Sequence, residues 1–153
     1  MKTSSQIDNQ TVELNLPSVM GYERVAMGCA ASFAASLGFK SARIEDLKTA
    51  VAEACTNAIR HGNRNLGDVR VLVTMCVRDD TFHVAVTDMG PGIRKTPGLP
   101  DIGKIIDEEA PPGGLGLFLI QQLVDQVDFN EMTNKGHAVR MLMKIERNRN
   151  SSQ

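Results

Sequence analysis

The sequence predicts an α+β fold, a two-layer sandwich in which a mainly antiparallel mixed sheet carries its helices on one face. The expected order of elements is a strand, two helices, two strands, a long loop, a helix and two strands. Short turns between consecutive strands favour antiparallel pairing, and helices with one apolar stripe cover a face of such a sheet. The chain has 153 residues, so we expect a single domain over residues 1–153 with its core at about 11–146.

The first strand and the first helix are predicted from two different periods of apolar residues. Residues 11–16 alternate apolar and polar side chains, as in a half-buried strand, and Pro17 ends that strand. Residues 20–37 repeat apolar side chains at helical spacing, and Gly38 stands where helices commonly end. The stripe expected to face the core comprises Val25, Cys29, Phe33 and Leu37.

A second helix is predicted to follow Ser41 and to carry Asp46 in its early turns. It should run to about His61, because Gly62 and Asn63 stop it. Its apolar side comprises Leu47, Val51, Ala54, Cys55 and Ala58.

The rest of the chain is predicted to supply four strands and one more helix. Residues 69–77 and 82–87 alternate in polarity on either side of Asp79–Asp80, which indicates a hairpin. Residues 88–112 are rich in Gly and Pro and form the long loop, and loops of this length in small domains are commonly functional or mobile. The last helix and strands are expected at 114–126, 128–132 and 138–145.

Composition and charge narrow the classes of function. The net charge is −1, which argues against a broad surface for nucleic acid or for an acidic membrane. The three cysteines are widely spaced, and we expect free thiols, with Cys29 and Cys55 buried. No apolar run suits export or a membrane span, so a cytoplasmic location is expected.

The second helix carries an acid and an amide on one stripe. Glu53, Asn57 and His61 follow each other at four-residue spacing, beside the buried face. Spacing alone equally fits solvated helix residues. Asn is nevertheless a poor residue for the middle of a helix, and an amide oxygen beside a carboxylate suits Mg²⁺.

Two glycine motifs follow this helix in the chain. Asp88, Gly90 and Gly92 come directly after a strand, where a tight turn leaves backbone open to a ligand or simply makes an ordinary turn. The second motif opens a helix, where free N–H groups favour phosphate, although a hinge into a buried helix has the same composition. It comprises Gly113, Gly114, Leu115, Gly116 and Leu117. The phosphate loop ending in Gly-Lys-Ser or Gly-Lys-Thr is absent from the sequence.

The order and spacing of the three motifs resemble the N, G1 and G2 boxes of the GHKL ATPases, which share the Bergerat fold. Within that superfamily the chain is similar to bacterial anti-sigma factors with serine-protein kinase activity, over roughly residues 11–146. The segments 52–58 and 113–117 are especially close to that group.

The resemblance implies a role for each motif residue. Glu53 would be the general base toward a protein serine, and Asn57 would hold the Mg²⁺ that bridges the phosphates of ATP. Asp88 would accept a hydrogen bond from the adenine amino group. The glycines would shape the pocket and approach the phosphates of ATP or ADP, with residues 94–112 as a lid. His61, Leu115 and Leu117 are carried over as nucleotide-binding positions within the same boxes.

The resemblance also implies partners. Members of this group are dimers that sequester a sigma factor and phosphorylate a serine of an anti-anti-sigma protein of the STAS fold. A homodimer is therefore expected. Arg24 occupies the place of an arginine on the first helix that contacts the partner, although a solvated helix arginine would look the same in the sequence.

Two departures from the family pattern keep a second hypothesis open. The turn before the last strand reads Lys135-Gly136-His137-Ala138, without the family's threonine, and Pro111 and Pro112 replace an arginine before the second glycine box. The alternative is a nucleotide-gated module that switches partners without phosphotransfer. A histidine-kinase catalytic domain is less favoured, because no helix with a phospho-acceptor histidine precedes the motifs.

Overall fold

The structure, a computed structural model, describes residues 10–90, 114–133 and 136–146 of the chain. The strands are β1 (Val12–Pro17), β2 (Arg70–Arg78), β3 (Thr81–Asp88), β4 (Gln126–Thr133) and β5 (Gly136–Lys144). The helices are α1 (Glu23–Ser36), α2 (Ser41–Asn57) and α4 (Gly114–Leu123), and a single π-helical turn, η1 (Ala58–Gly62), extends α2.

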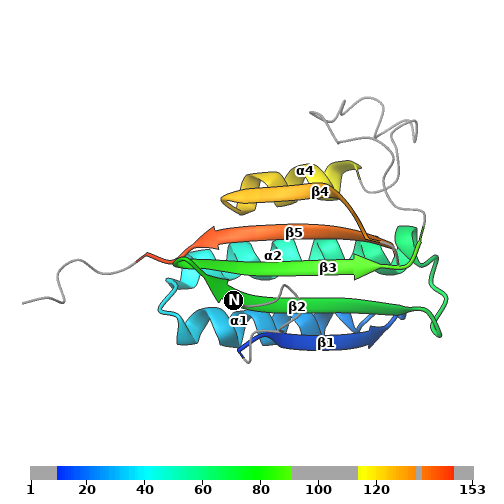
Figure 1. Cartoon of the computed structure of the whole chain (residues 1–153), viewed down its shortest axis with the longest axis horizontal. Helices are drawn as coiled ribbons and strands as arrows, with labels where there is room; N and C mark the ends of the chain where they lie inside the picture. Colours follow the sequence, from blue (N-terminus) through cyan, green and yellow to red (C-terminus); the bar gives the residue numbers. More distant parts are fainter. Residues whose placement is uncertain (1–9, 91–113, 134–135, 147–153) are drawn as a thin grey trace, which may run out of the picture.

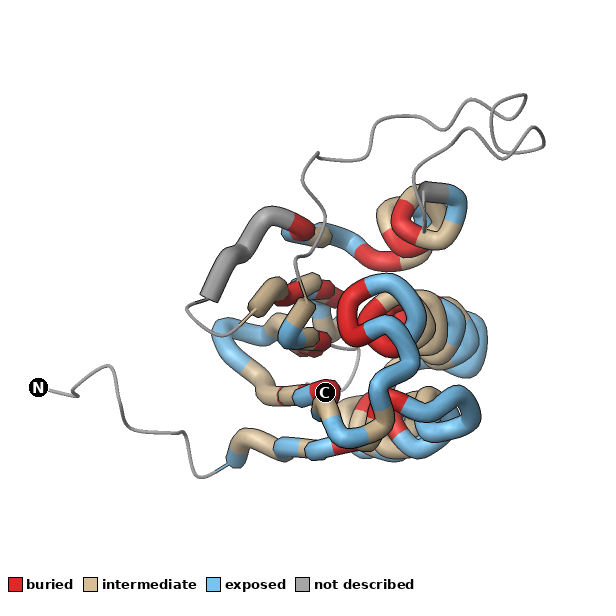
Figure 2. Tube along the Cα trace, turned by 90° about the vertical axis from the view of Figure 1, so that its right-hand side faces the viewer, coloured by how far each residue is buried: buried red, intermediate tan, exposed pale blue. Residues whose placement is uncertain are grey.

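The predicted two-layer α+β sandwich is confirmed. The five strands lie in the order β1-β2-β3-β5-β4, and every neighbouring pair is antiparallel. Helices α1, α2 and α4 cover one face of the sheet (Figure 1), and buried residues gather between the two layers (Figure 2). No helix in the described ranges is long and apolar enough to cross a bilayer.

The predicted hairpin between β2 and β3 is present, with Arg78 opposite Thr81. Asp79 and Asp80 both have positive φ, 50° and 59°, as a two-residue turn of type I′ requires, and such a turn matches the twist of the strands. The alternating side chains of both strands face the helices. Those buried are Val71, Val73, Met75, Phe82, Val84 and Val86.

The stripe predicted to be buried on α1 is partly wrong. Val25 is 49% exposed, and Cys29 and Phe33 are only half-buried. The fully buried positions are instead three alanines at four-residue spacing, Ala26, Ala30 and Ala34. Small side chains let α1 pack closely on α2. Cys29, Phe33 and Leu37 are partly buried and still pack against the core, and the Phe33 ring lies 4.8 Å from that of Phe82.

Gly38 ends α1 as the sequence predicts. Its φ of +86° is accessible to glycine at little cost. The Gly38 N–H donates to Ala35 O (3.1 Å) and the Phe39 N–H to Ala34 O (3.2 Å), the bonds of a Schellman motif. The turn places the Phe39 ring 6.2 Å from the ring of Phe82 in the core.

Helix α2 buries the predicted apolar side, but its last turn differs from the prediction. Regular α-helix stops at Asn57, and the Asn63 N–H donates to Ala58 O (2.8 Å), five residues back. The helical spacing that predicted an uninterrupted helix to His61 therefore fails after Asn57. Cys55 is fully buried, and burial raises the pKa of its thiol to about 12, so the thiol stays protonated.

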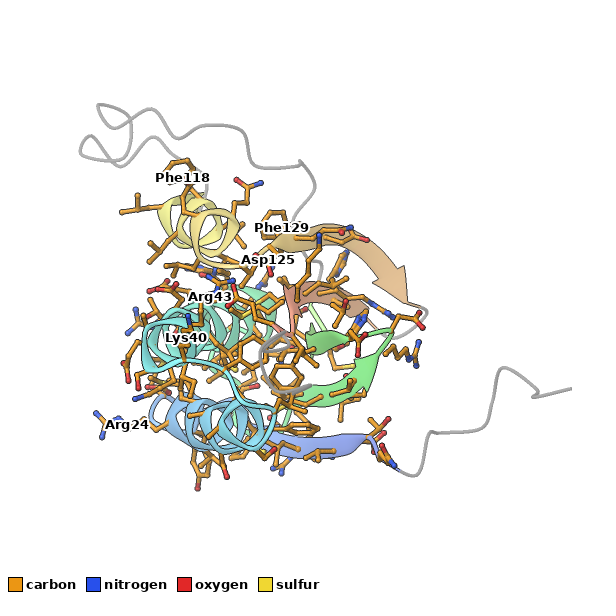
Figure 3. The ribbon with its side chains drawn as sticks, turned by 90° about the vertical axis from the view of Figure 1, so that its left-hand side faces the viewer. Arg24, Lys40, Arg43, Phe118, Asp125 and Phe129 are labelled. Carbon is orange, nitrogen blue, oxygen red and sulfur yellow. The ribbon has the colours of Figure 1, made fainter. Side chains whose placement is uncertain are left out.

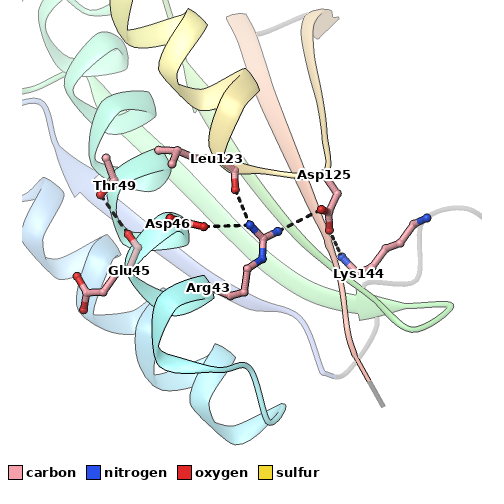
Figure 4. A network of polar contacts seen from close by, with 7 residues as sticks. All are labelled: Arg43, Glu45, Asp46, Thr49, Leu123, Asp125 and Lys144. Atoms are coloured by element: carbon pink, nitrogen blue, oxygen red, sulfur yellow. Dashed lines mark hydrogen bonds and ion pairs between the residues drawn. The ribbon is translucent and has the colours of Figure 1, made fainter. Parts of the chain in front are cut away.

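Arg43 joins the start of α2 to the end of α4 (Figures 3 and 4). Its guanidinium donates to Asp46 Oδ2 (3.1 Å), to the carbonyl of Leu123 (3.0 Å) and to Asp125 Oδ1 (3.1 Å). The second Asp125 oxygen accepts the N–H of Lys144, at the end of β5 (2.7 Å). A cation on the last carbonyl of α4 is also favoured by the helix dipole.

We expect Arg43→Met to lower the free energy of unfolding by about 1–2 kcal/mol, because the Leu123 carbonyl and Asp125 lose a charged donor. Lys48→Met is the matched control on the same helix. Lys48 forms a surface ion pair with the exposed Glu45 (3.3 Å), whose loss should cost about 0.5 kcal/mol or less. Urea unfolding measures both, and equal effects would show that the Arg43 network does not hold α4.

Candidate active site

Three chain segments that carry the sequence motifs end at one edge of the molecule. The C-terminal end of α2 with η1, the end of β3 and the start of α4 lie together at the right of Figure 1. Helix α2 packs against α4, and η1 packs against β3. The motif residues of the three segments are far apart in the sequence, but these contacts bring them together around α2 and η1.

The first wall of the site is formed by α2 and α4. Glu53 and Asn57 are half-buried on α2, one turn apart, and both lie against Gly116 in the first turn of α4. A Cβ added to Gly116 would lie 2.6 Å from Glu53 Oε2 and 3.4 Å from Asn57 Nδ2. A larger residue there would force the Glu53 carboxylate to move, and this carboxylate lies at the positive end of the α4 dipole.

The amide of Asn57 contains a buried polar atom that is available to a ligand. Within the described residues its Nδ2 atom is buried and has no hydrogen-bond partner, which costs free energy unless a ligand binds. A half-turn of the amide exchanges its oxygen and nitrogen. The side chain can therefore present an oxygen, beside the Glu53 carboxylate, to a hard cation such as Mg²⁺, which takes few protein ligands besides phosphates and water.

The second wall is formed by the end of β3 against η1. The Gly90 N–H donates to Asp88 Oδ1 (2.8 Å), which fixes the carboxylate of the half-buried Asp88. A Cβ at Gly62 would overlap this carboxyl group, and one at Gly90 would overlap the carbonyl of Gly62. Two glycines thus allow the close contact between β3 and η1 on which the position of Asp88 depends.

Burial raises the pKa of Asp88 above its usual value. The Gly90 N–H and the nearby His137 act in the opposite direction but do not cancel the effect of burial. A half-buried carboxylate is a strong acceptor for a ligand N–H group, because less water competes for it.

Two residues with a structural role in this wall were missed by sequence reasoning. Asn63, expected only to stop a helix, is buried and accepts the Met89 N–H (2.8 Å). Its Nδ2 donates to Ser18 Oγ (2.9 Å) and to Arg70 O (3.1 Å). His137 Nδ1 lies 2.9 Å from the carbonyl oxygen of Gly90. Neither has a local sequence signal, because both act through residues distant in the chain.

Other predicted positions lie elsewhere or outside the described residues. His61 is exposed, because η1 changes the helical rotation after Asn57. Leu117 is a core residue, whereas Leu115 is 54% exposed. Gly92, Gly113 and the predicted lid at 94–112 lie outside the described residues. Arg24 is exposed on α1, which packs on the side of α2 opposite α4 (Figure 3).

Comparison with known proteins identifies the family. The family model of the histidine kinase-like ATPase domain matches residues 16–143. Serine-protein kinase RsbW of Bacillus pumilus is 33% identical over 151 residues, covering 92% of this chain and 91% of that protein. The RsbW of Halalkalibacterium halodurans is 34% identical over 127 residues, covering 80% and 76%.

A solved structure supports the fold. The crystal structure of the RsbU and RsbW domains of a Mycobacterium tuberculosis protein aligns with a TM-score of 0.64 at 16% identity. The alignment covers 91% of this chain and 33% of that one, so it corresponds to about a third of the larger protein. The chain therefore belongs to the RsbW family of serine-protein kinases, which is built on a nucleotide-binding, histidine kinase-like ATPase domain.

Proposed function

We propose that this protein is an ATP-dependent protein-serine kinase and anti-sigma factor of the cytoplasm. It sequesters a sigma factor and phosphorylates a serine of a STAS-type anti-anti-sigma protein. The observation that carries the proposal is the meeting of Glu53 and Asn57 with Gly116. An acid and an amide whose Nδ2 atom has no hydrogen-bond partner in the described part of the chain thereby lie at the start of a helix that can bind phosphate.

The proposed nucleotide lies between the two walls. Asp88 accepts the adenine amino group, and the backbone N–H groups at the start of α4, including Gly114 and Gly116, bind the phosphates. Asn57 would hold the Mg²⁺ that neutralises phosphate charge during transfer. Five further positions stay predictions for the same pocket: Gly92, Gly113, Leu115, His61 and Leu117. Leu117 would contribute its backbone.

Glu53 is the proposed general base. Its carboxylate takes the proton of the substrate serine hydroxyl as the serine oxygen attacks the terminal phosphorus of ATP. The bond from that phosphorus to the bridging oxygen breaks, and ADP leaves with the electron pair. Phosphoryl transfer depends chiefly on positioning and charge stabilisation, so the proposed base acts together with Asn57 and the phosphate-binding start of α4.

The test is incubation with Mg-ATP and a purified STAS protein encoded by the same genome. We expect phosphoserine on the STAS protein, detected by mass spectrometry. Nucleotide binding without phosphoserine on any such partner would favour the alternative, a nucleotide-gated module that switches partners without phosphotransfer.

Gly116→Ala should slow phosphotransfer about tenfold or more, because the added Cβ displaces the Glu53 carboxylate, and misplaced catalytic groups lose about this much. Gly28→Ala is the matched control. Nothing lies within 4 Å of a Cβ at this helical position, where alanine should stabilise α1 by about 0.5–1 kcal/mol. Steady-state labelling and thermal unfolding compare the two. Wild-type rates for Gly116→Ala would show that Glu53 tolerates displacement.

The proposed partner surface lies at the start of α1. Arg24 is exposed there beside Tyr22 and Val25, which are 43% and 49% exposed. A guanidinium flanked by apolar side chains suits a protein contact, in which it can form charge-assisted bonds with an acidic group. A homodimer of this chain stays a further prediction.

Arg24→Glu should abolish binding of the sigma factor while leaving nucleotide affinity unchanged, because charge reversal at such a contact costs several kcal/mol. Arg78→Glu provides the control, since Arg78 is also exposed and ends β2 at the β2–β3 hairpin, which lies at the opposite end of the molecule (Figure 1). Interferometry with the immobilised sigma factor measures both variants. If Arg24→Glu binds like wild type, the partner surface lies elsewhere.

A further inference from the structure

The turn that carries Asp88 is held by β5 as well as by η1. In the sheet register His137 pairs with Asp88, although α4 and β4 lie between β3 and β5 in the sequence. A Cβ at Gly136 would overlap the carbonyl of Asp88, so the glycine at the start of β5 allows the two strands to meet here. The half-buried His137 side chain then reaches the far side of the turn.

The contact between His137 and the turn has a defined direction. Nδ1 lies 2.9 Å from the carbonyl oxygen of Gly90. A carbonyl oxygen only accepts, so Nδ1 carries the proton and donates it. In the neutral ring this assigns the acceptor role to Nε2.

Together with two other bonds, this contact restrains the described part of the turn, Asp88 to Gly90. The Met89 N–H donates to Asn63, and the Gly90 N–H donates to Asp88 Oδ1. The His137 bond immobilises the remaining polar group of Gly90, its carbonyl. The N–H and the carbonyl of Gly90 belong to successive peptide planes that meet at its Cα atom. Without the His137 bond this glycine rotates more freely about its two backbone bonds, and the N–H that orients the Asp88 carboxylate is held less firmly.

We propose that His137 is a positioning residue for adenine recognition: its Nδ1–H holds the Gly90 carbonyl and thereby aims the Asp88 carboxylate at the base. The inference rests on the proposed nucleotide site. It concerns recognition of the 6-amino group and not the phosphates, which bind at the distant wall formed by α4.

The experiment uses three variants and two nucleotides. His137→Asn keeps an N–H donor at the same number of bonds from the backbone as Nδ1, whereas His137→Gln moves the donor one bond outward and His137→Leu removes it. Binding of ATP and of inosine triphosphate, which lacks the 6-amino group, is measured by calorimetry on the full chain. Thermal unfolding of each variant accompanies the titrations.

We expect His137→Leu and His137→Gln to bind ATP about tenfold more weakly than wild type, the effect of about one lost hydrogen bond. Inosine triphosphate binding should change little, so the preference for ATP falls. His137→Asn should retain most of that preference. Equal losses for both nucleotides, or a failure of His137→Asn to restore the preference, would overturn the proposal and reduce His137 to a structural residue.

The outcomes separate this inference from the proposed function. If wild type binds ATP and Asp88→Asn does not, the nucleotide site stands whatever the His137 variants do. If every His137 variant prefers ATP as wild type does, only the role of His137 is wrong. If wild type binds neither nucleotide, the proposed function itself fails, and the inference with it.

Discussion

Replacing Glu53 by glutamine should leave ATP affinity intact and slow phosphotransfer to the STAS protein about 10²–10⁴-fold, the usual contribution of a general base. Glutamine has nearly the shape of glutamate and still fits beside Gly116, but its amide cannot accept the serine proton. The two quantities are measured by calorimetry with ATP and by transfer of radioactive phosphate in a single turnover.

Glu45→Gln is the matched control for this prediction. Glu45 lies two turns earlier on α2, and its side chain is 70% exposed, so its loss should change neither ATP affinity nor transfer. Transfer by Glu53→Gln at the wild-type rate would dismiss Glu53 as the base. A parallel loss of ATP affinity would instead show that Glu53 contributes to nucleotide binding.

Asp88→Asn should weaken ATP binding by about tenfold to a hundredfold, as expected for a lost hydrogen bond to a charged group. Asparagine keeps the bond from the Gly90 N–H through its Oδ1. Its NH₂ group then faces the adenine amino group, so two donors meet. Calorimetry on wild type and variant gives the result, and unchanged affinity would remove Asp88 from the pocket.

The raised pKa of Asp88 gives this variant a second signature. Burial disfavours the charged carboxylate in the folded protein, so its contribution to stability is greatest at low pH and is lost as the pH rises through the folded-state pKa. At pH 7 the neutral amide of the Asp88→Asn variant avoids this cost, and we expect unfolding at an equal or higher temperature. A lower unfolding temperature would show that the carboxylate stabilises the fold.

Wild-type affinity for ATP should also depend on pH. Because the pKa of Asp88 is raised, the carboxylate becomes protonated, and the acceptor is lost, at a higher pH than for an ordinary aspartate. The affinity of Asp88→Asn should not show this acid-side decrease.

The strands and the turn residues were predictable because their signals are local. Alternating polarity predicted β2 and β3, and Asp79–Asp80 predicted the turn that joins them, as the positive φ angles of both residues show. The proximity of Glu53 and Asn57 followed from four-residue spacing within one helix. Their meeting with Gly116 needed the family resemblance, since no local pattern places α4 against α2.

The features that sequence reasoning missed depend on tertiary packing. Val25 was expected inside because it is apolar, but alanines make the close helix contact and leave Val25 exposed. The π-helical turn after Asn57 accompanies the close contact of Gly62 with Asp88 and Gly90. His137 lies opposite Asp88 only because β5, and not β4, pairs with β3.

A crystal structure with Mg²⁺ and a non-hydrolysable ATP analogue would show whether one nucleotide spans the two walls of the site. We expect the adenine amino group at the Asp88 carboxylate, the phosphates at the first turn of α4 and the metal ion on the Asn57 side chain. A nucleotide bound elsewhere, or bound with its base away from Asp88 and its phosphates away from Gly116, would contradict this prediction.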